Sequence, residues 1–340
     1  MNAIAYPFEV PPAEGEATEI ADGILWLRLP LPMALDHVNV YALDDGDGWT
    51  IIDTGLNSRR GQAIWEAIQA GPLAGRPIRR LIVTHHHPDH VGLAGWFQSQ
   101  GVELLMTRTA WLYARMLTLD EQPLPTPEAL AFYRRAGVPD DILEKRAAER
   151  PFNFCDVVHP MPAGFTALTE GNVIQMAGRD WVVRLGSGHA PDHATFWSGD
   201  LVIGGDQLLP GISANIGVYP TEPAADPLAD WFAACRRFLP LATDRQLILP
   251  GHKLPFTGLP IRLGQMIENH DAALSRLLLH LQSPQTAHAC LTPLFKREIQ
   301  PSEHGLALVE AIAHLNHLLN KGLVDRRMGD KEEWLWQTIR

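Results

Sequence analysis

Histidine and aspartate gather in one short segment, residues 84–92, which has the sequence THHHPDHVG. Imidazole nitrogen and carboxylate oxygen are both ligands of borderline divalent cations such as zinc. Because side chains two positions apart on an extended chain point to the same side, His85 and His87 can bind one ion. The turn that follows brings Asp89 and His90 towards a second ion. The segment therefore predicts a metal centre with room for two ions.

Three single residues further along the chain extend this ligand set. His189 ends the sequence GSGH, Asp206 ends GGD and His252 ends PGH, and each follows a strand-like run. A glycine directly before a ligand lets the backbone approach closely without a clash from a Cβ atom. A histidine-rich run alone can be a plain surface feature, but the whole set in this order favours a metal centre.

The order H-x-H-x-D-H, followed by a histidine, an aspartate and a last histidine, resembles the metallo-β-lactamase superfamily over about residues 20–260. The resemblance implies two zinc ions per chain, with iron or manganese as alternatives. The implied ligands are His85, His87 and His189 for the first ion, Asp89, His90 and His252 for the second, and Asp206 as the bridge between them.

Three further residues are expected to support the site. Asp53, in IIDTG, matches the superfamily's first motif, which orients metal ligands without binding the ion. His193, in GHAPDH, is similar to a histidine that lies beside the site in thioester-cleaving and lactone-cleaving relatives, although Asp192 stands where glycine is common. A structural role and metal binding stay open for His193. Tyr219, in the loop after Asp206, is placed to contact substrate and polarise a carbonyl.

The residue at position 206 separates branches of the superfamily. True metallo-β-lactamases commonly carry cysteine there, so Asp206 implies instead the branch of hydroxyacylglutathione hydrolases, thioesterases and lactonases. The expected reaction is zinc-dependent hydrolysis of a thioester or ester by a metal-bridging hydroxide, with Asp89 and Asp206 as catalytic carboxylates. Three alternatives remain: a lactonase acting on a cyclic ester such as an acyl-homoserine lactone, a phosphodiesterase or ribonuclease, and a non-catalytic metal-binding protein.

The elements that must position these residues alternate between strand and helix patterns. Residues 23–84 contain short β-type runs and one helical segment that stops at Gly71-Pro72. Strand patterns resume after Gly171, with tight turns expected at residues 177–180 and 198–199. Two strand-rich halves interleaved with helices predict a layered α/β protein with sheets inside. By the resemblance, this is a four-layer αββα sandwich that forms a catalytic domain over residues 20–260.

A helical insert at about residues 107–151 interrupts this domain. It is rich in alanine, leucine, arginine and glutamate, and it carries aromatic and thioether side chains such as Trp111, Tyr113 and Met116. These side chains either pack helix on helix or form a roof over the active site that contacts an apolar acyl group.

Residues 261–340 are expected to form a helical linker and a small winged-helix-like module. Lysine and arginine balance aspartate and glutamate from Leu281 to Arg340, so the module is an unlikely duplex binder. His314 and His317, three positions apart on an apparent helix, are expected to pack or face solvent, because no carboxylate or third histidine accompanies them on that face.

The bulk composition limits the remaining classes of function. The chain of 340 residues has a formal net charge of −11, which argues against a nucleic-acid partner. Three separated cysteines predict neither a disulfide framework nor a thiolate zinc site. A signal peptide and a membrane-spanning stretch are not recognisable, so a cytoplasmic location is expected. The expected partner is a small-molecule substrate with an apolar acyl group, and a homo-oligomer remains open.

Overall fold

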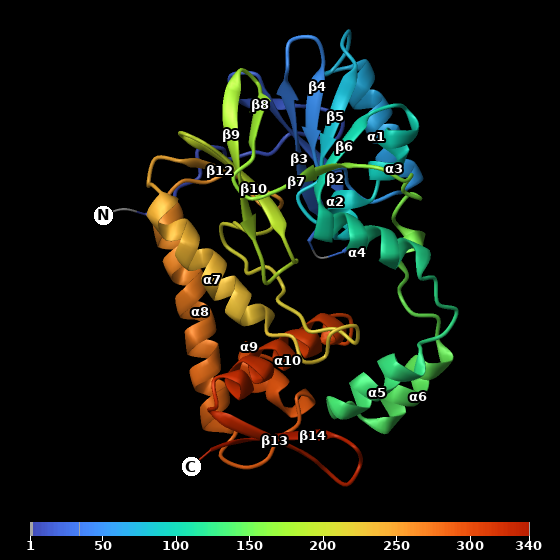
Figure 1. Ribbon diagram of the computed structural model, residues 1–340, viewed down its shortest axis with the longest axis vertical. Helices are drawn as coiled ribbons and strands as arrows, with labels where there is room; N and C mark the ends of the chain where they lie inside the picture. Colours follow the sequence, from blue (N-terminus) through green and yellow to red (C-terminus); the bar gives the residue numbers. More distant parts are fainter. Residues whose placement is uncertain (1–2, 34, 340) are drawn as a thin grey trace. The chain divides into compact units, whose positions relative to one another are not determined.

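The computed structural model describes residues 3–33 and 35–339 and forms two compact units (Figure 1). Unit 1 comprises Met1–Glu121, Asn153–Ala214 and Leu241–Arg262. Unit 2 comprises Gln122–Phe152, Asn215–Pro240 and Leu263–Arg340. Much of the helical insert, and the segment after residue 214, therefore belong to the same unit as the C-terminal region.

A seven-stranded sheet forms the first half of unit 1. Its strands, in spatial order, are β1 (Thr18–Ala21), β2 (Ile24–Pro30), β3 (His37–Asp44), β4 (Trp49–Ile52), β5 (Ile78–Ile82), β6 (Glu103–Thr107) and β7 (Thr166–Leu168). Strands β1 to β4 pair antiparallel, and β4 to β7 pair parallel. The carboxyl ends of the parallel strands β4 and β5 therefore lie at the same edge of the sheet.

A five-stranded sheet forms the second half of unit 1. Its strands are β8 (Val173–Met176), β9 (Arg179–Gly186), β10 (His193–Ser198), β11 (Leu201–Gly205) and β12 (Leu247–Pro250), in the order β12-β11-β10-β9-β8. The β8–β9 and β10–β11 hairpins turn where the sequence predicted. Strand β12 joins the edge in parallel with β11, so both strands end at the same side.

Alternating side chains build two cores around the first sheet. Trp26 packs into the core between the two sheets, together with Trp181 and Phe196 of the second sheet. The next residue, Leu27, points to the opposite face and packs into a second core against helices. The two sheets therefore face each other, and the outer face of the first is covered by helices.

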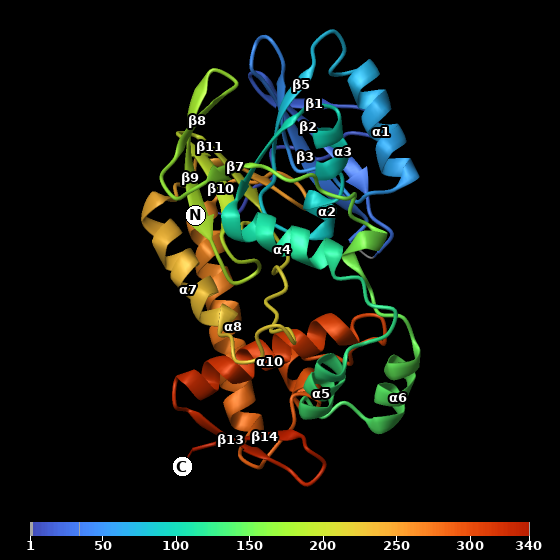
Figure 2. The same ribbon diagram turned by 45° about the vertical axis from the view of Figure 1, so that its right-hand side comes forward.

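The helices of unit 1 are α1 (Arg59–Ala70), α2 (Pro88–Val91), α3 (Ala94–Ser99) and α4 (Arg108–Leu119), with a 3₁₀ turn at Phe154–Asp156. Helix α1 begins where the Ser58 hydroxyl accepts from the Gly61 N–H at 2.9 Å, and it ends at Gly71. Trp65 of α1 packs edge-on against Phe97 of α3, with ring centroids 5.0 Å apart. Figure 2 shows these helices on one side of the seven-stranded sheet. The predicted α/β architecture, with sheets flanked by helices, is confirmed.

Unit 2 is mainly helical. Its elements are α5 (Pro127–Arg135), α6 (Asp140–Ala148), α7 (Pro227–Phe238), most of α8 (Leu259–His280), α9 (Leu291–Phe295), α10 (His304–Asn320), a 3₁₀ turn at His288–Cys290, and the hairpin β13 (Val324–Met328)–β14 (Trp334–Thr338). A further 3₁₀ turn, Leu239–Leu241, begins in unit 2 and ends at the start of a unit 1 segment. Asp226 caps α7 by accepting from the Ala229 N–H at 3.0 Å, as Asp226-Pro227 predicted. Within the described residues, every helix is too short or too polar to cross a membrane.

Candidate metal centre

Two triads of potential ligands lie together in unit 1. In each triad, one ligand atom per residue lies within 4.8 Å of the others. The triads are His85, His87 and His189, and Asp89, His90 and His252. These are the two ligand sets expected from the sequence, and a further group, His85, His90 and Asp206, links them.

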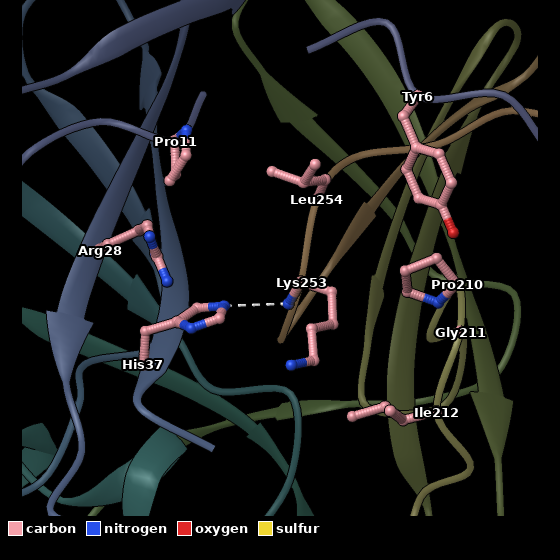
Figure 3. A pocket seen from close by; sticks show the side chains of 9 residues that line it. All are labelled: Tyr6, Pro11, Arg28, His37, Pro210, Gly211, Ile212, Lys253 and Leu254. Carbon is pink, nitrogen blue, oxygen red and sulfur yellow. Dashed lines mark hydrogen bonds between the residues drawn. The ribbon is translucent and has the colours of Figure 1, made fainter. Parts of the chain in front are cut away.

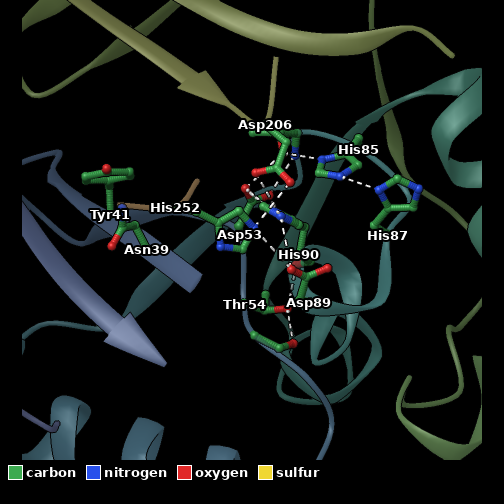
Figure 4. Close-up of polar contacts among 12 residues, drawn as sticks. Asn39, Tyr41, Asp53, Thr54, His85, His87, Asp89, His90, Asp206 and His252 are labelled. Carbon is green, nitrogen blue, oxygen red and sulfur yellow. Dashed lines mark hydrogen bonds and ion pairs between the residues drawn. The ribbon is translucent and has the colours of Figure 1, made fainter. Parts of the chain in front are cut away.

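The ligand residues sit at the ends of strands from both sheets. His85 and His87 follow β5, while Asp89 and His90 lie on the short helix α2. From the second sheet, His189 lies between β9 and β10, Asp206 directly follows β11, and His252 follows β12. Figure 4 shows the imidazoles and carboxylates turned towards one another. The site therefore depends on the packing of one sheet against the other.

The carboxylate of Asp206 contacts members of both triads. Its Oδ2 atom lies 3.5 Å from His189 Nε2 and 3.2 Å from His252 Nε2. Its Oδ1 atom lies 3.4 Å from His90 Nε2. One carboxylate with its two oxygens between two ligand sets has the arrangement expected of a bridging ligand.

The side chains fit a pair of cations. The facing nitrogens His85 Nε2 and His87 Nδ1 are 2.9 Å apart, as are His87 Nδ1 and His189 Nε2. Two buried atoms, His90 Nε2 and Asp206 Oδ1, lie 3.4 Å apart and form no hydrogen bond with any residue that the structure describes. Buried polar atoms are nearly always satisfied, and a bound cation would satisfy these two.

The outer ring nitrogens of three histidines are held by hydrogen bonds. His90 Nδ1 donates to Asp53 Oδ2 at 2.8 Å, and His252 Nδ1 donates to the His37 carbonyl at 2.7 Å. His85 Nδ1 lies 3.0 Å from the Thr84 hydroxyl, which itself donates to Asp53. Each of these bonds leaves Nε2 with its lone pair towards the centre. Metal-binding histidines are typically oriented in this way.

The two halves of the centre differ in electrostatics. Burial lowers the pKa of His85 and His87 well below the usual value, so both imidazoles are neutral. Burial also opposes the charged form of His90, but Asp206, Asp89 and Asp53 outweigh it and raise the pKa well above the usual value. Burial likewise opposes the charged form of His252, but Asp206 outweighs it and raises the pKa of His252 to about 10. The carboxylate-rich half therefore attracts positive charge, which a metal ion supplies in place of protons.

Asp53 and His193 support the cluster from behind. Asp53 has a φ of 60° and accepts from both the backbone N–H and the hydroxyl of Thr84, at 2.8 and 2.9 Å. His193 stacks on His85 with ring centroids 4.5 Å apart, and its Nε2 accepts from the Asp206 N–H at 3.1 Å. Burial lowers the pKa of His193 to about 3, so it stays a neutral acceptor. Both residues touch ligands, which suits a positioning role.

Local backbone features match the sequence expectations. A Cβ atom at Gly251 would lie 2.2 Å from Asp206 Oδ1, and one at Gly205 would lie 2.6 Å from His193 Cε1. The close approach predicted for glycines that precede ligands is thus observed at both positions. Asp192 adopts a φ of 49°, in the left-handed region that glycine enters most easily, and its carboxylate accepts from the Thr109 hydroxyl of α4.

A second set of positioning residues was missed by sequence reasoning. Asn39 of β3 donates to the carbonyls of Pro250 and Lys253, at 2.9 and 2.7 Å, and the Tyr41 hydroxyl donates to Pro250 at 2.8 Å. These bonds fix the loop that carries His252. The only signal in the sequence was a pair of polar side chains in a strand that is otherwise apolar.

A cavity of about 390 Å³ lies beside this loop (Figure 3). Arg28, His37 and Lys253 line it together with apolar side chains such as Leu254. His37 Nε2 accepts from the Lys253 N–H at 3.0 Å, one residue after His252. Two cationic side chains therefore face a cavity next to a metal-ligand candidate.

Helix α4 also adjoins the centre. Tyr113 lies against His86, with ring centroids 5.2 Å apart. His86 stands in the sequence between the ligand candidates His85 and His87. Three apolar side chains on this helix are exposed: Leu112 at 52%, Met116 at 45% and Leu119 at 70%. Trp111, in contrast, stacks on Phe165. Packing is thus observed for Trp111, while contact of the exposed side chains with an acyl group stays a prediction.

Two expectations concern unit 2. Tyr219 belongs to that unit, so the substrate contact expected of it stays a prediction. The statement that no carboxylate or third histidine accompanies His314 is wrong, because Glu310 lies one helical turn earlier and His270 approaches from α8. The partner of His317 is instead Asp226, with His317 Nδ1 3.0 Å from Asp226 Oδ1.

Comparisons with known proteins agree with this site. The model of the "Metallo-beta-lactamase superfamily" matches residues 33–252, and that of the "Metallo-beta-lactamase-like, C-terminal domain" matches residues 274–339. A beta-lactamase domain protein from Burkholderia ambifaria is 35% identical, with a TM-score of 0.91 and coverage of 99% of this chain and 98% of that one. A metallo-beta-lactamase family protein from Thermus thermophilus is 27% identical, with a TM-score of 0.78 and coverage of 94% of this chain and 100% of that one.

A curated relative from Bacillus subtilis extends the comparison. It bears the name "Probable metallo-hydrolase YqjP" and is 26% identical over 309 residues, which cover 87% of this chain and 92% of the relative. The superfamily model spans both ligand triads and the aspartate between them. The chain therefore belongs to the metallo-β-lactamase superfamily.

Proposed function

We propose that this protein is a metal-dependent hydrolase that binds two ions, preferably zinc, and cleaves a thioester or ester with an apolar acyl group. His85, His87 and His189 hold one ion, while Asp89, His90 and His252 hold the other. The observation that carries the proposal is the Asp206 carboxylate, which contacts both triads. The name of the Bacillus subtilis relative, a metallo-hydrolase, agrees with this class of reaction.

The chemistry divides between the ions and the side chains. When bound, the ions supply a water of lowered pKa and a Lewis acid for the scissile carbonyl. Asp206, whose backbone N–H is held by His193, orients the attacking water. Asp89 has the more exposed side chain, 19% against 9% for Asp206. We assign to Asp89 the transfer of a proton to the leaving thiolate or alkoxide, because it is the carboxylate that a leaving group reaches more easily.

Two neighbouring features support the choice of substrate. The exposed apolar side chains of α4 provide a surface for an acyl chain, since Thr109 and Tyr113 place the same helix beside the centre. The cavity lined by Arg28 and Lys253 suits an anionic group. Thioesters of glutathione and coenzyme A combine an acyl chain with an anionic carrier. A lactone is the next candidate, because it undergoes the same acyl transfer with the two products still tethered.

The substitution Asp206→Asn tests the centre. It removes a charge between the triads, so we expect thiol release from acyl-glutathione and acyl-coenzyme A to fall ~10³-fold in the zinc-loaded protein, as loss of a key electrostatic group typically does. Zinc content is measured alongside. Asp200→Asn makes the same change at an exposed residue that pairs with Arg179, and it is expected to retain full activity.

Two outcomes would contradict the proposal in different ways. Near-normal activity of Asp206→Asn would reject the catalytic assignment. No release from any thioester by the wild-type protein, with two zinc ions bound in unit 1, would reject the substrate class and point to lactones first and phosphodiesters second.

The substitution Lys253→Ala tests the anionic carrier. Loss of one cationic side chain from the cavity is expected to raise KM for acyl-glutathione about 5-fold, because a partly exposed ion pair contributes ~1 kcal/mol, and kcat should change little. The KM for an uncharged thioester of the same acyl group should not change. An equal rise in KM for both substrates would show that Lys253 shapes the loop and does not bind the carrier.

A further inference from the structure

A third cluster of potential ligands lies in unit 2, on two packed helices. His270 of α8 and the pair Glu310 and His314 of α10 each place a ligand atom within 4.8 Å of the others. Glu310 and His314 are four positions apart, so both project from one face of α10. His270 and His314 are only 4% and 1% exposed. The cluster is separate in sequence from the residues of the metal centre in unit 1.

The hydrogen bonds orient His314 as a ligand. Its Nδ1 atom lies 2.8 Å from the carbonyl of Glu310 and must donate to it, because a carbonyl only accepts. Nε2 therefore keeps its lone pair, and this atom lies 3.1 Å from His270 Nδ1. A backbone carbonyl on the outer ring nitrogen is a common support of metal-binding histidine. Burial also lowers the pKa of His314 to about 4, so the ring is neutral.

The carboxylate of Glu310 completes the set. The Asn215 amide donates to Glu310 Oε2 at 2.9 Å and so fixes the direction of the carboxylate. Burial raises the pKa of Glu310 to about 7, and the bond from Asn215 partly offsets this rise. On the other side, the rings of Trp231 and Phe232 lie 6.4 and 6.1 Å from His270 and enclose it in apolar surroundings.

Comparison within the same chain separates this cluster from ordinary histidine contacts. The nitrogen approach of 3.1 Å is close to the 2.9 Å between His85 and His87 in the metal centre. His288 and His304 also approach, at 3.0 Å, but they belong to no group of three potential ligands among the described residues. His317 Nδ1 lies 3.0 Å from Asp226 Oδ1 and so has a carboxylate partner outside the cluster. Only His270 and His314 combine an imidazole pair with a carboxylate in unit 2, within the part of the chain described.

We propose that His270, Glu310 and His314 form a further divalent-cation site that fastens α8 to α10. Imidazole nitrogen and carboxylate oxygen are both ligands that zinc takes in proteins. The ion is structural, since it joins two helices whose packing otherwise depends on side-chain contacts. The site does not depend on the reaction proposed for unit 1.

The test counts metal in the full-length protein. The wild-type chain, stripped by chelation, reloaded with zinc and passed through a desalting column, is expected to hold three zinc ions per chain by mass spectrometry of the metal. His314→Gln is expected to hold one fewer. His317→Gln and His288→Gln, which change neighbouring histidines of the same unit, should keep the full number.

A second measurement isolates the new site. In a chain whose first centre is disabled by His87→Ala and Asp206→Asn, the new site should keep its zinc, and added zinc should raise the melting temperature by several degrees. The rise should disappear when Glu310→Gln is added, a change that keeps the size of the side chain. If His314→Gln does not fold, Glu310→Gln takes its place in the metal count. Two ions in the wild type with no change in either variant, or equal loss in His288→Gln, would overturn the proposal.

Discussion

Glycine at position 251 leaves no room for any side chain. A Cβ atom there would meet Asp206 Oδ1 at 2.2 Å and His90 Cε1 at 2.9 Å, and both atoms belong to ligand candidates. These side chains are fixed by their own contacts, so they cannot withdraw without disturbing the centre. The glycine is therefore a condition for the close packing of these ligand candidates.

The substitution Gly251→Ala tests this condition. We expect zinc affinity at the centre in unit 1 to fall about 10–100-fold, in the range seen when groups around metal ligands are disturbed. The measurement is competition with a chelating dye. Gly264→Ala, on α8, is the matched control, because a Cβ atom there meets nothing within 4 Å. Equal affinity of the two variants would mean that the centre relaxes more freely than its packing indicates.

Residue spacing reveals ligands better than it reveals their supports. The candidate ligands stood out because His85, His87, Asp89 and His90 are close in sequence and the others follow glycines, while their division into two triads came from the family resemblance. Asn39 could not be predicted, since its partner Pro250 is 211 positions away and only the packing of two sheets brings them together. The approach of His270 to His314 could not be predicted either, because 44 positions separate the two residues. Long-range contacts leave no local pattern.

Among the elements, α4 has apolar side chains on two different faces. Its buried alanines, Ala110 and Ala114, pack in the core with the seven-stranded sheet. Its exposed Leu112, Met116 and Leu119 recur at helical spacing on a different face. The sequence left open whether the insert packs or contacts substrate, because periodicity alone shows that a face is apolar and not what covers it.

The substitution Leu112→Ser tests α4 as an acyl surface. Partial burial of this leucine by a long acyl chain contributes about 1 kcal/mol, so we expect kcat/KM for long-chain thioesters to fall ~5-fold. The acetyl thioester, which is too short to reach along the helix, should be unaffected. Leu279→Ser replaces another exposed leucine, on α8, and serves as the control. A uniform loss over all chain lengths would indicate a general disturbance of α4.

The positions of helices and strands along the chain were predicted more completely than the division of these elements between the two units. Hairpin turns and helix caps are local, and those at Ser198-Gly199 and Asp226 form where the sequence placed them. The grouping of residues 122–152 and 215–240 with the C-terminal region depends on contacts between distant segments. The winged-helix-like character of the tail stays a prediction, although helices and a terminal hairpin are present.

For the whole molecule, we expect ions bound at the candidate metal centre to hold the two sheets of unit 1 together. Its ligands come from the ends of strands in both sheets, and three carboxylates, Asp53, Asp89 and Asp206, lie within or behind the cluster. Without cations these negative charges repel each other at close range. Ions that bind only the folded state stabilise it by mass action, by ~2.7 kcal/mol at a hundredfold excess over Kd.

Removal of the metal tests this expectation. A strong chelator is expected to lower the melting temperature by roughly 5–10 °C, given a shift of about 2–4 °C per kcal/mol for domains of this size. Zinc, but not magnesium, should restore it, because the ligand nitrogens suit zinc. The Asp206→Asn variant should show a smaller shift. An unchanged melting temperature after verified removal of the metal would contradict this expectation.

The distribution of ligands along the chain has a consequence for biosynthesis. During synthesis, His85, His87, Asp89 and His90 emerge with the strand β5 that precedes them, before any strand of the second sheet has been made. The first triad is complete only when His189 has emerged, and the second waits for His252. Until the second sheet packs against the first, a nascent chain thus presents an incomplete set of ligand candidates to the cations around it. On the proposed ligand sets, we therefore expect the folded protein, and not the nascent chain, to select the metal.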